Sequence, residues 1–360
     1  MDAAGRERGK IKVLLVDDSM IALTLLKRML STASDIEVAG TAGNGKEALA
    51  LIPELDPAVV ITDLHMPVMG GLEFTKEVMA RYPRPLLVVS VSVQEGSHNV
   101  FNLLEAGAVD VFPKPRSLIE EEFMARAEEL KSRIRILAGV HVFRRVKKGP
   151  PAAATPVKLK SPGATPQAPR IVAIGASTGG PQALQSILGQ LPPDFPLPIV
   201  CVQHIGDGFL NGLIEWLGKS SQLSVMIAPE GEAPRPGTVY FPPEGAHLVV
   251  DETGRFRHSH EGPVSGHCPS VTMTFKSIAA RYGAGAIGTL LTGMGADGAE
   301  GMKAIADAGG ATIAQDEKTS VVFGMPRRAI DLGAAGEVLP LDSIATAIAA
   351  KVQSNAEKGG

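Results

Sequence analysis

Short apolar runs rich in β-branched residues recur along the chain and alternate with segments of helical periodicity. Four of them precede residue 149, namely IKVLLV, AVVIT, PLLVVSVSV and AVDVF. Four more follow residue 169, namely RIVAIG, PIVCVQ, GAIGTLLTG and GGATIAQ. Runs of this length with little polar alternation suit strands that helices cover on both faces. The pattern predicts two doubly wound α/β domains with mostly parallel sheets, and functional groups at the carboxyl ends of the strands.

The segment between the two sets of strands differs in composition. Residues 149–169 read GPPAAATPVKLKSPGATPQAP, with few large apolar side chains. Such a segment buries too little surface to offset the entropy of ordering it, so it is expected to be a flexible linker. A length of 360 residues also favours two domains. We therefore expect one domain over residues 10–136, a linker over 137–168 and a second domain over 169–354.

Charge and cysteine content narrow the class of protein. A formal net charge of −3 gives no electrostatic footprint for nucleic acid or for an anionic membrane. The two cysteines, Cys201 and Cys268, cannot form a disulfide framework. The N-terminal MDAAGRERGK lacks the apolar segment of a signal peptide, and no apolar run reaches membrane-spanning length. The expectation is a cytoplasmic protein that neither binds nucleic acid nor inserts into a membrane.

Ionisable side chains follow several strands of the first predicted domain. Asp17 and Asp18 follow the run IKVLLV, Asp63 follows AVVIT and Lys114 comes just after AVDVF, while Ser90 lies near the end of the strand expected in PLLVVSVSV. Three neighbouring carboxylates repel one another unless a cation lies among them, and Mg²⁺ suits an all-oxygen site. A carboxylate beside that ion can attack phosphorus while a lysine neutralises charge. Helix capping by the paired aspartates is the alternative, which Asp63 and Lys114 at matching strand ends disfavour.

Over residues 11–135 these motifs resemble the receiver domain of two-component response regulators, which has a flavodoxin-like fold. The resemblance implies that Asp63 accepts a phosphoryl group from a chemotaxis histidine kinase. It also implies a set of Mg²⁺ ligands, the carboxylates of Asp17, Asp18 and Asp63 and the backbone carbonyl of His65.

The same resemblance implies a switch that reports phosphorylation. Ser90 is the expected switch hydroxyl and Lys114 the partner of the phosphoryl group. Ser92 is an alternative to Ser90, because the register of VVSVSV is open. A cis bond between Lys114 and Pro115 is also implied.

The second domain begins with RIVAIGASTGGPQALQSIL, a strand, a Gly-rich corner and a helix. Such a corner can hold the phosphates of a dinucleotide or expose a serine nucleophile. Pro181 stands where short-chain dehydrogenases would have their third glycine, and His204 ends the next strand where an acid should bind the ribose. The dinucleotide reading is therefore disfavoured.

Three side chains at strand ends favour a nucleophile instead. Ser177 follows the first strand of this domain, His204 the second, and Asp297 lies in the Gly-rich turn after a third. His204 would take the proton of Ser177, while Asp297 would fix the imidazole tautomer. Backbone N–H groups around Met294 are candidates for the oxyanion hole. Each of the three side chains alone could have a purely structural role. Three such side chains at one edge of a sheet would be a coincidence, so a catalytic role is favoured.

The motifs IGASTGG, QHI, LTGMGADGA and TIAQDEKTSVVFGMP resemble the Rossmann-like catalytic domain of chemotaxis protein-glutamate methylesterases. The resemblance implies hydrolysis of glutamate γ-methyl esters, and deamidation of glutamines, on methyl-accepting chemoreceptors. It implies Ser177, His204 and Asp297 as the triad, with Thr178 and the backbone of Met294 in the active site, and no cofactor for the esterase. A receiver and a hydrolase on one chain predict that the receiver restrains the esterase until it is phosphorylated.

The chain departs from the family pattern in one place. Where the family usually shows Arg-Pro-Ser-Val-Asp, HCPSVTM places Cys268 and Thr272. The preceding HSHEGPVSGHC also carries His258, His260 and His267, but its spacing matches no compact zinc pattern, so a solvated loop is expected. A response regulator whose second domain binds a partner or DNA is the alternative function, and the lack of a basic face disfavours DNA.

Overall fold

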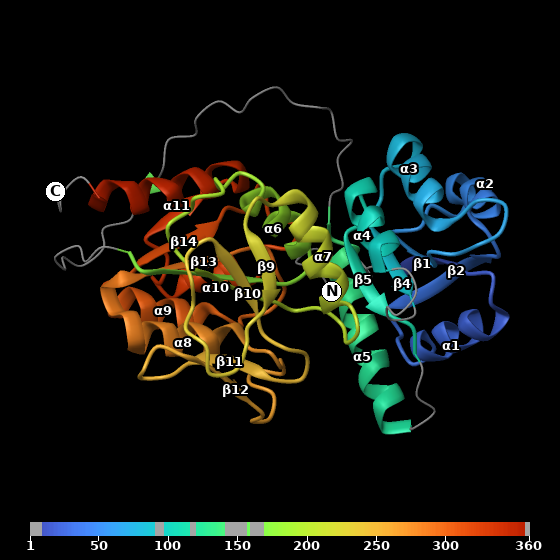
Figure 1. Cartoon of the computed structure of the whole chain (residues 1–360). Coiled ribbons are helices and arrows are strands. Elements are labelled where there is room, and N and C mark those ends of the chain that lie inside the picture. Colours follow the sequence, from blue (N-terminus) through green and yellow to red (C-terminus); the bar gives the residue numbers. More distant parts are fainter. Residues whose placement is uncertain (1–8, 91–96, 116–119, 141–156, 159–168, 357–360) are drawn as a thin grey trace. The chain divides into compact units, whose positions relative to one another are not determined.

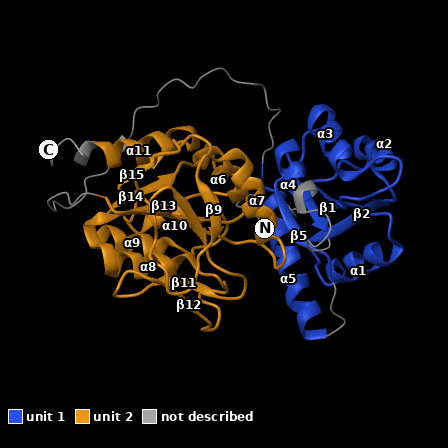
Figure 2. Ribbon diagram, in the orientation of Figure 1, with its two compact units in different colours: residues 1–147 blue, residues 148–360 orange. Residues whose placement is uncertain are grey.

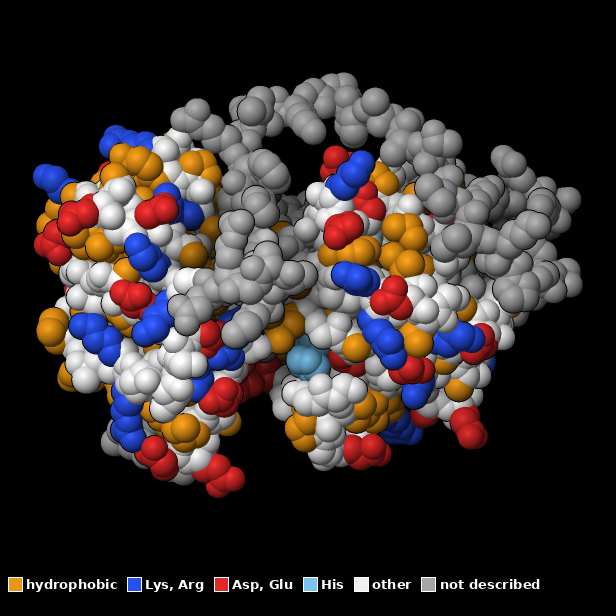
Figure 3. Space-filling model, turned by 180° about the vertical axis from the view of Figure 1, so that it is seen from behind, with side chains coloured by type: hydrophobic (Ala, Val, Ile, Leu, Met, Phe, Trp, Pro, Cys, Tyr) orange, Lys and Arg blue, Asp and Glu red, His pale blue; other side chains and the backbone are white. Residues whose placement is uncertain are grey.

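The computed structural model describes residues 9–90, 97–115, 120–140, 157–158 and 169–356 (Figure 1). The chain divides into two compact units, residues 1–147 and residues 148–360, which Figure 2 shows in different colours. Among the described helices, none combines the length and the apolar character needed to cross a membrane. Figure 3 shows Lys and Arg side chains interspersed with Asp and Glu across the described surface of that view.

Unit 1 contains a five-stranded parallel sheet in the order β2-β1-β3-β4-β5. This order confirms the flavodoxin-like topology predicted for the first domain. The strands are β1 (Ile11–Val16), β2 (Ile36–Ala42), β3 (Val59–Thr62), β4 (Leu86–Ser90) and β5 (Asp110–Pro113). The helices are α1 (Met20–Leu30), α2 (Gly45–Leu55), α3 (Gly71–Arg81), α4 (Ser97–Ala106) and α5 (Glu120–Leu137).

Local sequence signals fix where the helices of unit 1 begin. The hydroxyl of Ser19 accepts a hydrogen bond from the Ala22 N–H at 3.3 Å and caps α1. At α2, Asn44 accepts from the Glu47 N–H while the Glu47 carboxylate accepts from the Gly43 N–H, both at 3.0 Å. The helices therefore start directly after the strand ends, so the aspartates that follow β1 lie at one edge of the sheet.

Unit 2 contains, among the described residues, an eight-stranded sheet in the order β6-β15-β14-β13-β7-β8-β10-β9. Every neighbouring pair in it is parallel except β6 with β15, and a separate antiparallel pair, β11 with β12, completes the strands of the described part. The first strands are β6 (Val157–Lys158), β7 (Ile171–Ala176), β8 (Ile199–Gln203), β9 (Ser224–Ile227) and β10 (Thr238–Phe241). The others are β11 (His247–Val250), β12 (Phe256–Ser259), β13 (Ala286–Leu290), β14 (Ala311–Gln315) and β15 (Glu337–Leu339).

The helices of unit 2 connect these strands. They are α6 (Gly180–Leu188), α7 (Leu210–Ser220), α8 (Val271–Tyr282), the 3₁₀ turn η1 (Gly283–Gly285), α9 (Ala299–Asp307), α10 (Met325–Asp331) and α11 (Leu341–Ala356). From β7 the chain continues to β8 on one side, whereas β13 pairs with β7 on the other. This reversal of strand order is a topological switch point, the usual place for a binding or catalytic site in such sheets.

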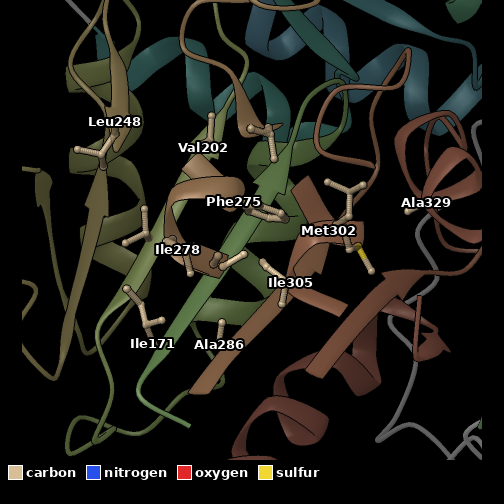
Figure 4. Packing of buried hydrophobic residues seen from close by; sticks show 14 of the residues in the cluster. Ile171, Val202, Leu248, Phe275, Ile278, Ala286, Met302, Ile305 and Ala329 are labelled. Carbon is tan, nitrogen blue, oxygen red and sulfur yellow. The ribbon is translucent and has the colours of Figure 1, made fainter. Parts of the chain in front are cut away.

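The core of unit 2 joins the sheet to α8 and α9. Figure 4 shows Phe275 and Ile278 of α8 and Ile305 of α9 packed among side chains of the strands. These three side chains have no exposed surface. Burying a side chain of this size contributes about 1.5–3 kcal/mol, so α8 and α9 are held firmly against β7 and β13.

Several sequence expectations need correction here. Val157 and Lys158, inside the expected linker, form β6 and pair antiparallel with β15. The expected end of the fourth strand near Ser90 is confirmed, since β4 ends at that residue, and residues 91–96 lie outside the described part. The expected cis bond before Pro115 is wrong, since the cis peptide bond within the described residues precedes Pro269. Trans is preferred by only about 0.5–1 kcal/mol before proline, so sequence alone does not decide the isomer.

The contact between α8 and α9 yields a stability prediction. A Cβ at Gly301 would lie 2.5 Å from Phe275 Cβ and 2.9 Å from the carbonyl oxygen of Thr272. Gly301→Ala should therefore lower the free energy of unfolding of unit 2 by about 1–3 kcal/mol, the usual cost of overpacking. Urea unfolding followed by the fluorescence of Trp216, the single tryptophan of the chain, measures it.

Gly218→Ala is the matched control, because a Cβ at that position in α7 meets nothing within 4 Å. Adding the methyl group there should leave stability unchanged or raise it by up to about 1 kcal/mol. A Gly301→Ala protein as stable as the parent would contradict the close packing of the two helices.

Candidate functional site

Unit 1 brings together the three carboxylates that the sequence singled out. Asp17 and Asp18 follow β1 and Asp63 follows β3, and these two strands are paired neighbours. One carboxylate oxygen from each lies within 4.8 Å of the others. Asp17 and Asp63 are buried, whereas Asp18 is exposed. A set of oxygen ligands this compact and partly open to solvent fits a divalent cation such as Mg²⁺, which retains several waters.

Lys114 is the cation of this cluster. Its Nζ lies 2.7 Å from Asp17 Oδ2 and 2.9 Å from Asp63 Oδ2. Burial raises the pKa of Asp63, and Lys114 offsets this effect only in part. Burial alone would lower the pKa of Lys114, but its hydrogen bonds to both aspartates raise that pKa overall. Lys114 therefore remains charged and holds the two buried carboxylates together.

The other residues predicted for unit 1 lie on adjoining segments. Ser90 is buried at the end of β4, and its carbonyl accepts a hydrogen bond from the Lys114 N–H at 2.8 Å. His65 lies two residues beyond Asp63, before α3, with its side chain exposed. Ser92, the alternative to Ser90, lies outside the described residues.

In unit 2 the Gly-rich corner after β7 carries Ser177. The residue that caps α6 is Gly179, with a φ of +76°, so Ser177 is not the helix cap. A Cβ at Gly180 would lie 2.0 Å from Gln203 Oε1, so glycine is required for the corner to approach β8. Gln203 in turn donates from Nε2 to the carbonyl oxygens of Ser177 and His204, each at 2.8 Å. One buried amide thus joins the segments that carry the serine and the histidine.

The loop after β13 lies against the same corner. A Cβ at Gly293 would lie 2.7 Å from Ser177 Cβ, and the Ser177 N–H donates to the Thr292 carbonyl at 3.0 Å. The Thr292 hydroxyl donates to the carbonyl of Thr178, which is buried, at 2.9 Å. Met294 follows Gly293 with its side chain 37% exposed. Thr178, Met294 and Ser177, which the sequence predicted to lie together, therefore lie on segments that follow two adjacent strands.

His204 and Asp297 form a buried pair. His204 Nε2 lies 2.9 Å from Asp297 Oδ2, and the two side chains are 8% and 0% exposed. The Asp297 carboxylate also accepts from the hydroxyl of Ser270 and from three backbone N–H groups at 2.8–3.0 Å, those of Val271, Thr272 and Gly298. Two of these N–H groups belong to the first turn of α8, so the carboxylate occupies the positive end of that helix.

These contacts set the ionisation of Asp297. Burial raises the pKa of the carboxyl, but hydrogen bonds from His204 and Thr272 outweigh it and hold the pKa well below its usual value. An ionised carboxylate can only accept, so His204 Nε2 carries the proton. The remaining nitrogen, Nδ1, is buried and has no hydrogen-bond partner in the described part of the chain, and no hydrogen bond joins Ser177 Oγ to His204.

Nδ1 is therefore the nitrogen that is left to act as a base. In triads of the chymotrypsin type the two ring nitrogens have the opposite roles. Turning the ring over would place a carbon at the Asp297 carboxylate, so the hydrogen bond itself fixes this assignment.

The expected solvated loop is wrong at two of its histidines. The ring of His267 stacks on that of His204, with centroids 3.9 Å apart and planes 8° from parallel. His258 Nε2 lies 2.8 Å from the carbonyl oxygen of Ala228. The prediction rested on the spacing of the histidines along the sequence, which matched no zinc site. That spacing does not show that the loop carrying His267 folds back over the end of the strand that precedes His204.

The two residues that depart from the family pattern take defined positions. The Thr272 hydroxyl accepts from the Gly298 N–H at 2.7 Å, and its own N–H donates to Asp297. Cys268 is partly buried, and burial together with the nearby charge of Asp207 raises the pKa of its thiol. Thr272, Gln203 and His267 are site residues that sequence reasoning missed, although Gln203 directly precedes His204 in a buried strand.

Comparison with known proteins places both units. Residues 172–348 match the family model described as CheB methylesterase, and residues 13–126 match the response regulator receiver domain. Unit 2 is similar to the crystal structure of the Thermotoga maritima CheB methylesterase catalytic domain, at 38% identity and a TM-score of 0.50. That match covers 52% of this chain and 100% of the solved one.

Two curated relatives match almost the whole chain. Protein-glutamate methylesterase/protein-glutamine glutaminase 2 of Anaeromyxobacter dehalogenans is 44% identical, covering 97% of this chain and 98% of that protein. Protein-glutamate methylesterase/protein-glutamine glutaminase 1 of Syntrophus aciditrophicus is 40% identical, covering 93% of this chain and 96% of that protein. With a receiver domain ahead of the catalytic one, the chain belongs to the CheB methylesterase family.

Proposed function

We propose that unit 2 hydrolyses γ-methyl esters of glutamate, and deamidates glutamine, on chemoreceptors. The observation that carries the proposal is the buried His204–Asp297 pair beside the Ser177 corner at the switch point of the sheet. The curated relatives carry both activities in their names. Both substrates present an acyl carbon with a small leaving group, so one site can act on either.

The first half of the reaction uses the three side chains in turn. Ser177 Oγ attacks the carbonyl carbon of the substrate side chain while His204 Nδ1 takes the hydroxyl proton. Asp297 stabilises the imidazolium that results. Backbone N–H groups of the loop around Met294, with Thr178 beside them, bind the oxyanion of the tetrahedral intermediate. His204 then gives its proton to the leaving methanol or ammonia.

The second half is the same for both substrates, because both leave the same acyl group on Ser177. Water attacks the acyl carbon and gives a proton to His204 Nδ1. The intermediate collapses, His204 returns the proton to Ser177 Oγ, and a glutamate side chain leaves. The triad residues thus regain their starting protonation states.

We further propose that unit 1 controls this activity through phosphorylation of Asp63 by a histidine kinase. Asp17, Asp18 and Asp63, with the carbonyl of His65, would hold Mg²⁺, which neutralises charge on the phosphoryl oxygens when bound. Lys114 would contact the phosphoryl group, and Ser90 would report it by hydrogen bonding. In this proposal unit 1 restrains the esterase of unit 2, and phosphorylation of Asp63 releases it. The protein acts in the cytoplasm.

Ser177→Ala tests the nucleophile. No other hydroxyl takes its place in the proposed mechanism, so methanol release from a methylated receptor should fall by about 10⁴–10⁶-fold. Ser186→Ala on α6 is the control and should keep the parent rate. A Ser177→Ala protein within about tenfold of the parent would exclude the assignment.

Asp63→Asn tests the receiver. A small phosphodonor with Mg²⁺ should add one base-labile phosphoryl group to the parent and speed methanol release, and Asp63→Asn should lose both effects. Intact-mass measurement follows the label. Asp35→Asn is the control and should keep both the label and the faster methanol release. Asp35 directly precedes β2, so it lies at the opposite end of the strands from Asp63. A label that persists in Asp63→Asn, or forms equally well in chelator, would contradict the acidic site.

A further inference from the structure

The ring of His267 lies face to face with that of His204, outside the triad. We propose that His267 is a positioning residue, whose ring holds the His204 imidazole in the plane where Nε2 meets Asp297 and Nδ1 can serve Ser177. The inference rests on the proposed function of the triad. The loop before α8, which carries His267, would then help to position the base of the reaction.

The geometry of the pair supports this role. The single hydrogen bond to Asp297 fixes one atom of the His204 ring at 2.9 Å, which leaves the ring free to tilt about that contact. A second ring 3.9 Å away and only 8° from parallel opposes the tilt. Nδ1 has no hydrogen-bond partner in the described part of the chain, so stacking supplies the constraint that a second hydrogen bond would give.

The loop that carries His267 is itself tightly built. Val264 and His267 exchange two backbone hydrogen bonds of 3.0 Å across a two-residue turn. The turn residues, Ser265 and Gly266, have φ angles of +54° and +81°, as a type I′ turn requires. The side chain of His267 therefore projects from a defined hairpin end.

One buried ring anchors both ends of this loop. His247, on β11, is 0% exposed. Its Nε2 lies 3.3 Å from the Gly262 carbonyl, and its Nδ1 accepts from the Ser270 N–H at 3.0 Å. The Ser270 hydroxyl in turn donates to Asp297, which binds His204. Ser270, at the start of α8, therefore contacts both the residue that anchors the His267 loop and the residue that holds His204.

Proton transfer depends steeply on such alignment. Displacing a reacting group by about 1 Å can lower a rate by about 10²-fold. A misplaced His204 would still leave the receptor free to bind, because the stacked rings act on the base rather than on the substrate. The signature of the proposal is therefore a fall in kcat with little change in KM.

The test compares His267→Ala with His267→Phe in the full-length protein. His267→Ala should lower kcat for methanol release by about 10–100-fold and leave KM within about threefold. His267→Phe keeps a ring to stack and should restore most of the activity. Labelling of Ser177 by a small fluorophosphonate, which needs no receptor, should slow in parallel in the alanine variant. His260→Ala, an exposed histidine of the same segment, is the control.

Three results would overturn the proposal. The first is a His267→Ala protein with kcat within about twofold of the parent. The second is restoration by His267→Asn but not by His267→Phe, which would assign the effect to a hydrogen-bonding nitrogen. The third is a change in KM alone, which would make His267 a receptor contact. If the parent protein released no methanol, the proposed function would be wrong, whatever the role of His267. Unfolding curves followed by Trp216 fluorescence show whether a variant has lost activity because it has lost its fold.

Discussion

The Asp297 carboxylate accepts hydrogen bonds from the first turn of α8, from the Ser270 hydroxyl and from the His204 ring. These bonds satisfy N–H groups that the start of a helix leaves without intrahelical partners. They also keep the carboxylate ionised although it is fully buried. The same charge therefore serves the fold and the chemistry, since its loss would weaken the acceptor of the Val271 and Thr272 N–H groups of α8 and would also release the tautomer of His204.

The rest of the catalytic edge depends on how closely three strand ends approach one another. Gly180 gives Gln203 the room to hold the carbonyls of Ser177 and His204, and Gly293 lets the β13 loop touch Ser177. Unit 1 uses the same edge of its own sheet differently. There Lys114 bridges two buried aspartates and so offsets the repulsion between their like charges.

Much of this arrangement can be predicted from the sequence, because apolar runs mark buried parallel strands and the residues after them must meet at one edge. Ser177, His204 and Asp63 follow their strands directly and were found in this way. His267 was missed because its position depends on a loop that folds back over a distant strand end, which no local pattern encodes. The edge strand β6 was missed for a related reason, since its two residues pair only because β15 offers an open edge.

The proposed roles of His204 and of α8 both require buried Asp297 to be ionised, and carboxyl-carbon NMR of protein labelled with ¹³C-aspartate measures its ionisation. The Asp297→Asn spectrum identifies the resonance by its absence. We expect this resonance not to shift between about pH 7 and about pH 4, because the carboxylate stays ionised below the ordinary aspartate pKa of about 3.9. A titration midpoint at or above that ordinary value would contradict the account.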